Sequence, residues 1–357
     1  MSELTMPASV FPLLADPGYW PHTVDLMGDP EARDYWIGVF ENHLPSLVRH
    51  CHRIAGDEQG GPQRIEAMRQ AFASQLATLR RDPAAFGELT ILRICRLREN
   101  NLRAHGLADP YAPVKHEQNE AAMKLLPDVL AELDAIDPAD RLEALIRGVF
   151  AGNVFDLGAV STNTRFDEGG FDFHHTRKDI ADRPWLFDDF EALARRWAGT
   201  PHRKAVVFVD NAGADLLLGM VPLCRQMLQR GTTVVLTANT LPALNDITIA
   251  ELPELLDRIA GFDRTIADAL ADGRLSGIAS GNDAPLIDLR QVSPELAEAA
   301  ADADLVVLEG MGRAVETNLH AAFTCDALKL AIIKEQHLAA QLGGRLYDTV
   351  CKFEPAA

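Results

Sequence analysis

The sequence predicts an α/β fold in which an all-helical domain precedes a doubly wound α/β/α domain. Residues 34–147 repeat apolar side chains at helical spacing, and three short β-branched runs appear after residue 202. Helical stretches separate those runs, and strands that alternate with helices are typical of a parallel sheet covered on both faces. We therefore expect residues 1–200 to form the helical domain with a connecting loop, and residues 201–357 to form the α/β domain.

The helical half is divided by prolines and turn residues. Apolar side chains recur at helical spacing, with charges between them, in residues 64–80, 89–102, 119–133 and 141–150. Prolines separate these stretches or fall in their first turns, at Pro83, Pro110, Pro127 and Pro138. Residues 161–182 are polar and contain glycine, which predicts a loop or a connection between the domains.

The second half alternates between strand and helix patterns. The β-branched runs that predict strands are residues 205–209, 233–237 and 305–308. Residues 214–230 and 252–261 have helical periodicity, and an apolar pattern in residues 345–353 could add a late strand. The chain order strand, helix, strand is the order of a doubly wound sheet.

Composition and charge exclude several classes of protein. The chain of 357 residues has 34 Lys and Arg against 52 Asp and Glu, so its formal net charge is −18. A chain this acidic repels nucleic acid, and we expect no nucleic-acid partner. A small phosphorylated substrate stays compatible, because a bound divalent cation can reverse the potential inside one pocket.

The cysteines and the N-terminus bear on the compartment. The five cysteines contain no CxxC pair, which argues against a zinc site or a disulfide framework and fits the cytoplasm. Residues 1–21 carry no Lys or Arg and no long apolar core, so they do not resemble a signal peptide. No apolar run approaches the ~20 residues of a membrane span, so we expect no membrane partner. The sequence leaves the oligomeric state open, a homo-oligomer included.

Polar residues follow two of the predicted strands where a ligand would bind. Asp210 and Asn211 come directly after residues 205–209, and Asp246 lies in the segment after the second strand. Ligands of doubly wound sheets bind beyond the carboxyl ends of the strands, and carboxylate and amide oxygens suit Mg²⁺ or Mn²⁺. Each Asp could instead be a turn or helix-cap residue. Two converging carboxylates require a cation or a proton between them, which favours a shared metal site.

A third polar segment, EGMGR, follows the strand at residues 305–308. Gly310 and Gly312 would let backbone N–H groups approach an anion at a helix start, and Arg313 offers a planar donor fork for a phosphate or carboxylate. Val315 stands where a dinucleotide-binding motif needs its third glycine, so the segment is weak support for NAD. Lys334 follows the apolar residues 330–333 and could face the same crevice, although a solvated lysine is the simpler interpretation.

Other well-known catalytic motifs are not found. The sequence has no GxxxxGK[ST] phosphate loop and no GxSxG nucleophile elbow. Ala212 stands where an Asp-x-Asp phosphatase needs its second acid, and Glu120 replaces the second histidine of a zincin motif that begins at His116.

Taken together, the motifs resemble a known family. The segments VDNAGADLLLGMVPL, RGTTVVLTANTLPALNDIT and ADLVVLEGMGRAVETN are similar to the damage-control phosphatase superfamily, formerly the domain of unknown function eighty-nine. EGMGR is the signature of its second subfamily, which includes the C-terminal domain of the type four pantothenate kinase. The likeness extends in order from about residue 30 to the end, through LRENNLRAHGLADPYAPVKHEQNEAAM, LIRGVFAGNVFDLGA, RPWLFDD and LKLAIIKEQHLAAQLGGRLYD.

The resemblance implies a fold, a cofactor and an activity. It implies a helical domain packed on a Rossmann-like α/β/α domain, with the active site between them. A divalent metal ion, Mn²⁺, Co²⁺, Ni²⁺ or Mg²⁺, would be held by Asp210, Asn211 and Asp246. The implied reaction is hydrolysis of phosphomonoesters, and the second subfamily acts on 4′-phosphopantetheine and its oxidised or damaged forms, which limits damage in coenzyme A metabolism.

Roles for individual residues follow from the resemblance together with charge. Asp210 or Asp246 would be the attacking group or base, a choice that the sequence leaves open, and Lys334 and Arg313 would balance charge on the phosphoryl group. Glu309, Gly310 and Gly312 complete the expected phosphate-binding segment.

Contacts from the helical half are expected from Asn153, Asp156 and Arg98. A helix-ending turn that caps the next segment explains the first two equally well. A charged helix face explains Arg98 nearly as well as a substrate contact does. One departure lies in Asn239, Thr240 and Leu241, where animal relatives have Asn-Ser-Gly, a change that could reshape the substrate pocket.

Three alternatives stay open. Other branches of the superfamily hydrolyse sugar phosphates, and a methyltransferase activity has been proposed for a related branch. A non-catalytic nucleotide- or cofactor-binding module is the alternative outside enzymes, but such a module has no need for converging carboxylates.

Overall fold

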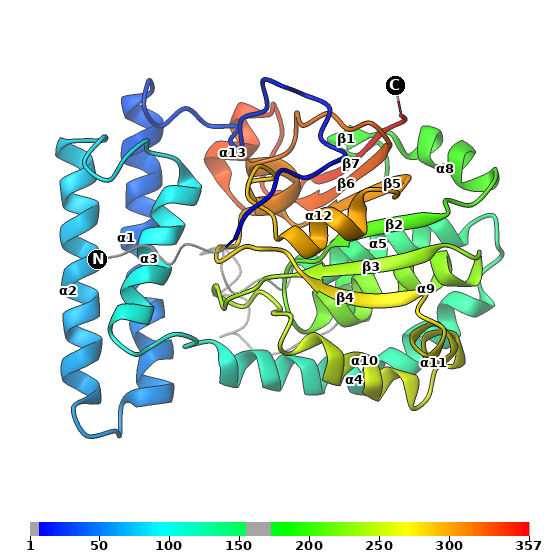
Figure 1. Cartoon of the computed structure of the whole chain (residues 1–357), viewed down its shortest axis with the longest axis horizontal. Coiled ribbons are helices and arrows are strands. Elements are labelled where there is room, and N and C mark those ends of the chain that lie inside the picture. Colours follow the sequence, from blue (N-terminus) through cyan, green and yellow to red (C-terminus); the bar gives the residue numbers. More distant parts are fainter. Residues whose placement is uncertain (1–6, 155–172, 357) are drawn as a thin grey trace.

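A seven-stranded sheet organises the molecule (Figure 1). The computed structural model describes residues 7–154 and 173–356. The strand order is β1-β7-β6-β5-β2-β3-β4, and β6 and β7 are antiparallel while the other neighbours are parallel. The strands are β1 (Phe187–Asp188), β2 (Lys204–Phe208), β3 (Thr233–Ala238), β4 (Leu275–Ala279), β5 (Leu305–Glu309), β6 (Asp326–Ile332) and β7 (Thr349–Glu354).

Helices precede the sheet and cover both of its faces. Before β1 lie α1 (Pro30–Ala55), α2 (Gly61–Arg81), α3 (Ile91–Ala104), α4 (Ala112–Ala135), α5 (Arg141–Val154) and α7 (Phe173–Asp179). After β1 lie α8 (Phe190–Ala198), α9 (Val221–Gln229), α10 (Leu252–Ala260), α11 (Arg264–Ala271), α12 (Pro294–Ala300) and α13 (Gln336–Gln341). Two π-helical turns, η1 (Asp215–Met220) and η2 (Met311–Glu316), follow the loops after β2 and β5.

Alternation along the central strands divides the apolar core in two. Val206 and Phe208 of β2 pack with residues of α1–α3, α12 and the N-terminal segment, whereas Ala205 and Val207 pack with α4, α5, α9, α10 and α11. Successive side chains of a strand point to opposite faces, so one strand supplies both cores. In Figure 1, α1–α3 stand beside one end of the sheet, whereas α4 and α5 lie with α9, α10 and α11.

The fold class predicted from the sequence is confirmed. The four helices expected in the first half correspond to α2–α5. The helical stretches expected at residues 214–230 and 252–261 correspond to η1 with α9 and to α10, and the expected strands correspond to β2, β3, β5 and β7. The division of the chain near residue 200 stays a prediction. One finding bears on it: α4 and α5 belong to the sequence's helical half, yet they pack against the sheet's own core.

Some local expectations are corrected. Residues 161–172 of the predicted loop lie outside the described residues, but the rest of that loop contains the helix α7. Pro127 lies inside α4 rather than at its start. Within the described residues, no helix is both long enough and apolar enough to cross a membrane.

Candidate active site at the carboxyl ends of the strands

The predicted site residues gather at the carboxyl ends of four adjacent strands. In the order of the sheet, β6 leads to Lys334, β5 ends in Glu309, β2 leads to Asp210, and β3 leads to Asn239 and on to Asp246. The chain winds outward from β2 to β3 and β4 on one side, and from β5 to β6 on the other. The reversal between β2 and β5 is the crevice where open α/β sheets bind ligands.

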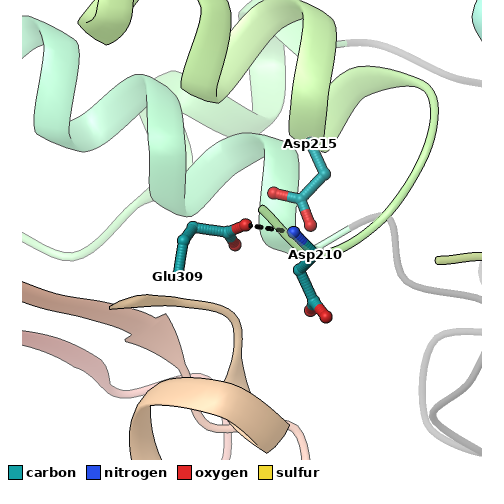
Figure 2. A group of neighbouring side chains, drawn as sticks. All are labelled: Asp210, Asp215 and Glu309. Atoms are coloured by element: carbon teal, nitrogen blue, oxygen red, sulfur yellow. Dashed lines mark hydrogen bonds between the residues drawn. The ribbon is translucent and has the colours of Figure 1, made fainter. Parts of the chain in front are cut away.

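Three buried carboxylates meet at this crevice. Asp210, Asp215 and Glu309 each offer an oxygen, and these oxygens all lie within 4.8 Å of one another. Figure 2 shows Asp215 and Glu309 approaching each other, and its dashed line marks the 3.0 Å bond from the Asp210 backbone N–H to Glu309 Oε2. This bond ties the end of β2 to the end of β5.

Two amide side chains hold the carboxylates in place. Asn211 Nδ2 donates to Asp210 Oδ2 at 2.9 Å and to Asp215 Oδ2 at 2.7 Å. Asn153, in the last turn of α5, donates from Nδ2 to Asp215 Oδ2 at 2.9 Å and to Glu309 Oε1 at 2.8 Å. Asn153 therefore does reach the crevice from the helical half of the sequence.

Arg313 joins the two carboxylates that the resemblance implies as metal ligands. Its Nη1 donates to Asp210 Oδ1, and its Nη2 donates to Asp246 Oδ2 at 2.8 Å. Asn239 supplies a further acceptor to Nη2 at 2.9 Å and a donor to Asp246 Oδ2 at 2.8 Å. The planar guanidinium suits this bridging position, because its donors form a rigid fork. The Asp210 carboxylate therefore accepts hydrogen bonds from two side chains of the site, Asn211 and Arg313.

Gly310 is required by close packing at this site. Its φ of +95° lies in a region that L side chains rarely adopt, and a Cβ there would lie 2.2 Å from Asp210 Oδ2. A Cβ at Gly312 would lie 2.6 Å from the carbonyl oxygen of Pro285. Gly310 thus lets the start of η2 lie directly against Asp210 at the end of β2, and Gly312 lets η2 pack against the backbone at Pro285.

The group defined by these contacts, which we call the acid cluster, is short of positive charge. It comprises Asp210, Asp215, Asp246 and Glu309 together with the cations Arg313 and Lys334. Four carboxylates against two cations leave a formal charge of −2. Converging carboxylates of this kind require a cation or a bound proton.

The residues present fit a divalent metal ion. Oδ1 of Asp215 is buried and has no hydrogen-bond donor, so one oxygen of the cluster lacks a partner. Carboxylate and amide oxygens are the hard donors that Mg²⁺ and Mn²⁺ prefer. Burial raises the pKa of Asp215, an effect that Lys334 and the hydrogen bonds from Asn211 and Asn153 oppose.

A cavity of about 590 Å³ adjoins the acid cluster. Asp210, Asn211, Asp246 and Lys334 line it from the sheet side, and residues of α1 and α3 line it from the other. Lys334 Nζ donates to the backbone oxygen of Asn153 at 3.0 Å. The size lies within the range of pockets that enclose a small organic ligand.

The remaining predicted residues lie as follows. Arg98, on α3, lines the cavity, while Asp156 lies outside the described residues. Cys95 also lines the cavity, and burial raises the pKa of its thiol to about 12, so it is a neutral thiol at ordinary pH. A neutral thiol is a poor nucleophile, which argues against a cysteine-based reaction.

Sequence reasoning missed three polar residues of the site. Asp215 stands at the start of an apolar helical stretch, and its spacing of four from Asn211 was the only signal for it. Asn239 lies in the loop that differs from the animal relatives, and no local pattern marks it as a partner of Asp246 and Arg313. Asn245 is fully buried, and neither atom of its side-chain amide has a partner; its backbone oxygen accepts from Ala212 N at 2.9 Å.

Comparison with known proteins gives one family match and several relatives. Residues 39–350 match the damage-control phosphatase ARMT1-like domain. A damage-control phosphatase of Arabidopsis thaliana is 44% identical, over 89% of this chain and 87% of the relative. The 4′-phosphopantetheine phosphatase of Mus musculus is 35% identical, over 99% of this chain.

Some relatives are much longer than this chain. Pantothenate kinase 2 of Arabidopsis thaliana is 45% identical over 97% of this chain, but the chain spans only 42% of that protein and 49% of the mouse phosphatase. Among solved structures, a DUF89 family protein from Pyrococcus horikoshii superposes with a TM-score of 0.62 at 19% identity. The alignment covers 86% of this chain and 96% of that one, which supports the fold.

Proposed function

The chain belongs to the damage-control phosphatase ARMT1-like family, and from that premise we propose that it is a metal-dependent phosphatase of small phosphomonoesters. The observation that carries the proposal is the acid cluster beside the cavity, with its formal charge of −2. A divalent cation would neutralise this charge and attract a phosphate group to a site that is otherwise repulsive to it.

The metal ligands we propose come from two overlapping sets. Asp210 is common to both: the resemblance adds Asn211 and Asp246, whereas the geometry adds Asp215 and Glu309. The bond from Arg313 Nη2 to Asp246 Oδ2 supports the second set, because that oxygen of Asp246 already has a cationic partner. When bound, the metal ion draws electron density from a phosphoryl oxygen and so favours attack on phosphorus.

The chain's own residues supply the remaining chemistry. Asp210 or Asp246 acts as the attacking group or as the base, and Asn211 and Asn153 hold the carboxylates in fixed positions. Arg313 and Lys334 stabilise the negative charge that spreads over the transferred phosphoryl oxygens. Gly310 and Gly312 allow the EGMGR segment to pack closely enough for these contacts.

The substrate we propose is 4′-phosphopantetheine and its oxidised or damaged forms. The name of the mouse relative supports this choice, as does the resemblance of the EGMGR segment to the signature of the second subfamily. The cavity is also larger than a phosphate group needs, so the body of the substrate can be enclosed. The compartment we propose is the cytoplasm, a choice that the five free, buried cysteines support.

Phosphate release from 4′-phosphopantetheine tests the proposal directly. It is measured with Mn²⁺, Co²⁺, Ni²⁺, Mg²⁺ or EDTA, for the wild type and for Asp210→Ala. We expect metal-dependent release that EDTA and Asp210→Ala each abolish. Activity on sugar phosphates alone would keep the metal chemistry and exclude the pantetheine substrate. If no phosphomonoester is hydrolysed with any metal, the molecule is a binding module and the enzymatic proposal fails.

A further inference from the structure

Two loops bring carboxylates to the acid cluster from neighbouring strands. The first site loop, residues 209–214, joins β2 to η1 and carries Asp210. The second site loop, residues 239–251, joins β3 to α10 and carries Asp246. The loops pair directly, since Ile247 N donates to the backbone oxygen of Asp210 at 3.0 Å. The separation of the two carboxylates therefore depends on how both loops are held.

Asn119 of α4 holds the first site loop from the helical half of the sequence. Its Oδ1 accepts from the backbone N–H of Gly213 at 2.7 Å, and the residue is 7% exposed. Gly213 has a φ of +76°, and a Cβ there would lie 2.8 Å from Cβ of Gln118, the residue before Asn119. The helix therefore lies directly against the loop, and a buried N–H of the loop has a side-chain acceptor in place of water.

Gly213 stands midway between two residues of the site. Asn211 lies two residues before it and Asp215 two residues after it, and Asn211 N donates to Asp215 Oδ2 at 3.2 Å. A shift of Gly213 would therefore move both the amide that orients the carboxylates and the carboxylate whose second oxygen has no donor. A misplacement of about 1 Å at a reaction centre lowers a rate by up to about 10²-fold.

Lys115, one turn earlier on α4, holds the second site loop. It is fully buried, and its Nζ lies 2.9 Å from Glu251 Oε1 and 2.8 Å from Asp109 Oδ2. Glu251 Oε2 accepts in turn from Thr248 N at 2.9 Å and from Thr248 Oγ1 at 2.6 Å. Burial lowers the pKa of Lys115, but the two carboxylates raise it further, so the lysine keeps its charge. Residues four apart share one face of a helix, so a single face of α4 contacts both loops.

We propose that Asn119 and Lys115 are positioning residues, which fix the two site loops relative to one another so that the carboxylates of the acid cluster converge. The proposal rests on the proposed function and adds residues that act through the loops, since neither residue is among those that line the cavity. Arg313 joins Asp210 to Asp246 across the boundary between the same two loops. The helix α4 thus sets the geometry that this bridge requires.

Asn119→Leu tests the contact with the first loop, because leucine has a similar volume and no acceptor. We expect kcat for 4′-phosphopantetheine to fall about 30-fold while KM changes less than about threefold. The Kd for Mn²⁺ should rise about tenfold, because the ligands are no longer held in place. A purely structural role would lower the melting temperature and leave the kcat of the folded protein unchanged.

Two further variants at this position complete the test. Asn119→Asp keeps an oxygen where Gly213 N donates, so its kcat should stay within about threefold of the wild type. Asn119→Ala removes the acceptor without adding apolar bulk, and we expect it to match Asn119→Leu. It decides the question if the leucine variant does not fold. A kcat for Asn119→Asp as low as that of Asn119→Ala would overturn the role of the acceptor.

Glu251→Gln tests the contact with the second loop, because it keeps the shape of the side chain and removes the charge that faces Lys115. We expect kcat to fall about tenfold. The Kd for Mn²⁺ should rise less than in Asn119→Leu, since the first loop carries Asp210 and leads into Asp215. An unchanged kcat would show that Lys115 only stabilises the fold, and would overturn its part in the proposal.

Glu120→Gln is the matched control. Glu120 follows Asn119 on α4, and its carboxylate accepts from Arg258 Nη1 at 2.5 Å and from Nη2 at 3.1 Å. Arg258 belongs to α10 and lies outside both site loops. This variant should therefore keep kcat and the Kd for Mn²⁺ within about twofold of the wild type. Equal losses in Glu120→Gln and Asn119→Leu would show that any weakening of α4 lowers activity, and would overturn the positioning role.

Binding of Mn²⁺ separates this proposal from the phosphatase proposal, because calorimetry with the metal alone requires no catalysis. A higher Kd in Asn119→Leu, together with a wild type that hydrolyses nothing, would overturn the phosphatase alone. Unchanged kcat and Kd in Asn119→Leu would overturn the positioning role even if the wild type releases phosphate. If the wild type neither binds Mn²⁺ nor hydrolyses any phosphomonoester, both proposals fail.

Discussion

Buried aspartates stand at both ends of the strands, with opposite electrostatic outcomes. We call the side of the sheet where the parallel strands begin the amino edge and the side where they end the carboxyl edge. At the amino edge, Asp326 opens β6 and accepts from Arg196 Nε at 2.6 Å, His202 Nε2 at 2.8 Å and Ala356 N at 2.8 Å. At the carboxyl edge, four carboxylates of the acid cluster share the cations Arg313 and Lys334. The same side chain is fully compensated at one edge and under-compensated at the other.

The pKa directions follow this difference. Burial raises the pKa of both Asp326 and Asp215, but at Asp326 the hydrogen bonds from Ala356, His202 and Arg196 outweigh it, so the net shift is downward. At Asp215 burial prevails and the pKa is raised. A structural ion pair stabilises its charge with protein groups, whereas a binding site leaves part of that work to a ligand.

The largest expected effect is a difference in activity between a variant at the carboxyl edge and a variant at the amino edge. We expect Asp210→Asn to lower phosphate release by at least about 10³-fold, because it removes a carboxylate of the proposed reaction centre. Asp326→Asn should keep activity within about threefold and lower the free energy of unfolding by about 1–3 kcal/mol, because it weakens a buried network. Phosphate release and urea unfolding of both variants check this. Equal loss of activity in both variants would remove the functional distinction between the edges.

Variants of two glycines with nearly the same φ sharpen the comparison. Gly310 and Gly231 have φ of +95° and +93°, but a Cβ at Gly231 would meet no atom within 4 Å. Both alanine variants should lose about 1 kcal/mol of stability from backbone strain. Only Gly310→Ala, which displaces Asp210, should also lose about 10²-fold in kcat. Kinetics and thermal unfolding of the pair test this, and a large activity loss in Gly231→Ala would contradict it.

Metal binding should raise the free energy of unfolding through residues of the carboxyl edge alone. At a Mn²⁺ concentration of about 100 times the Kd, the free energy of unfolding should rise by about 2.7 kcal/mol. We expect Asp215→Asn to abolish this gain, Asp246→Asn to reduce it less, and Asp326→Asn to leave it unchanged. Thermal unfolding with Mn²⁺ or EDTA measures all three. A greater loss in Asp246→Asn than in Asp215→Asn would favour the ligand set implied by the resemblance.

The smallest expected effect is a pH dependence at the amino edge. Because the folded pKa of Asp326 is lowered, its contribution to stability is complete above the unfolded value of about 3.9 and is lost as the pH falls through the folded value. The stability difference between the wild type and Asp326→Asn should therefore shrink as the pH is lowered below about 4. Urea unfolding across that range tests it, and a difference independent of pH would show that the ion pair contributes nothing.

The sequence predicts much of the carboxyl edge and little of what holds its loops in place. An apolar run that ends in Asp-Asn or Glu-Gly is local information, so β2, β5 and their polar ends could be identified. The partners of Arg313 could not, because Asp210 and Asp246 come together only when two loops pair, as the bond from Ile247 N to Asp210 O records.

Other features leave no local pattern at all. Asn119 is an ordinary polar position of a helix, and its bond to Gly213 N arises only from tertiary packing. The two-residue strand β1 is too short to have a period. The sequence does not identify Asp215 as a site residue, because the apolar stretch after it is typical of a helix with an acidic first turn.

The bridge made by Arg313 also has a consequence for the order in which the site forms on the ribosome. Arg313 lies 103 residues after Asp210, which at 5–20 residues per second is a delay of roughly 5–20 s during translation. Asp210, Asp215 and Asp246 therefore leave the exit tunnel before any arginine of η2 or any lysine after β6 can reach them. Until then these acids lack the two cations of the acid cluster, so the contacts of the site are completed only after β6 and the lysine that follows it have been synthesised.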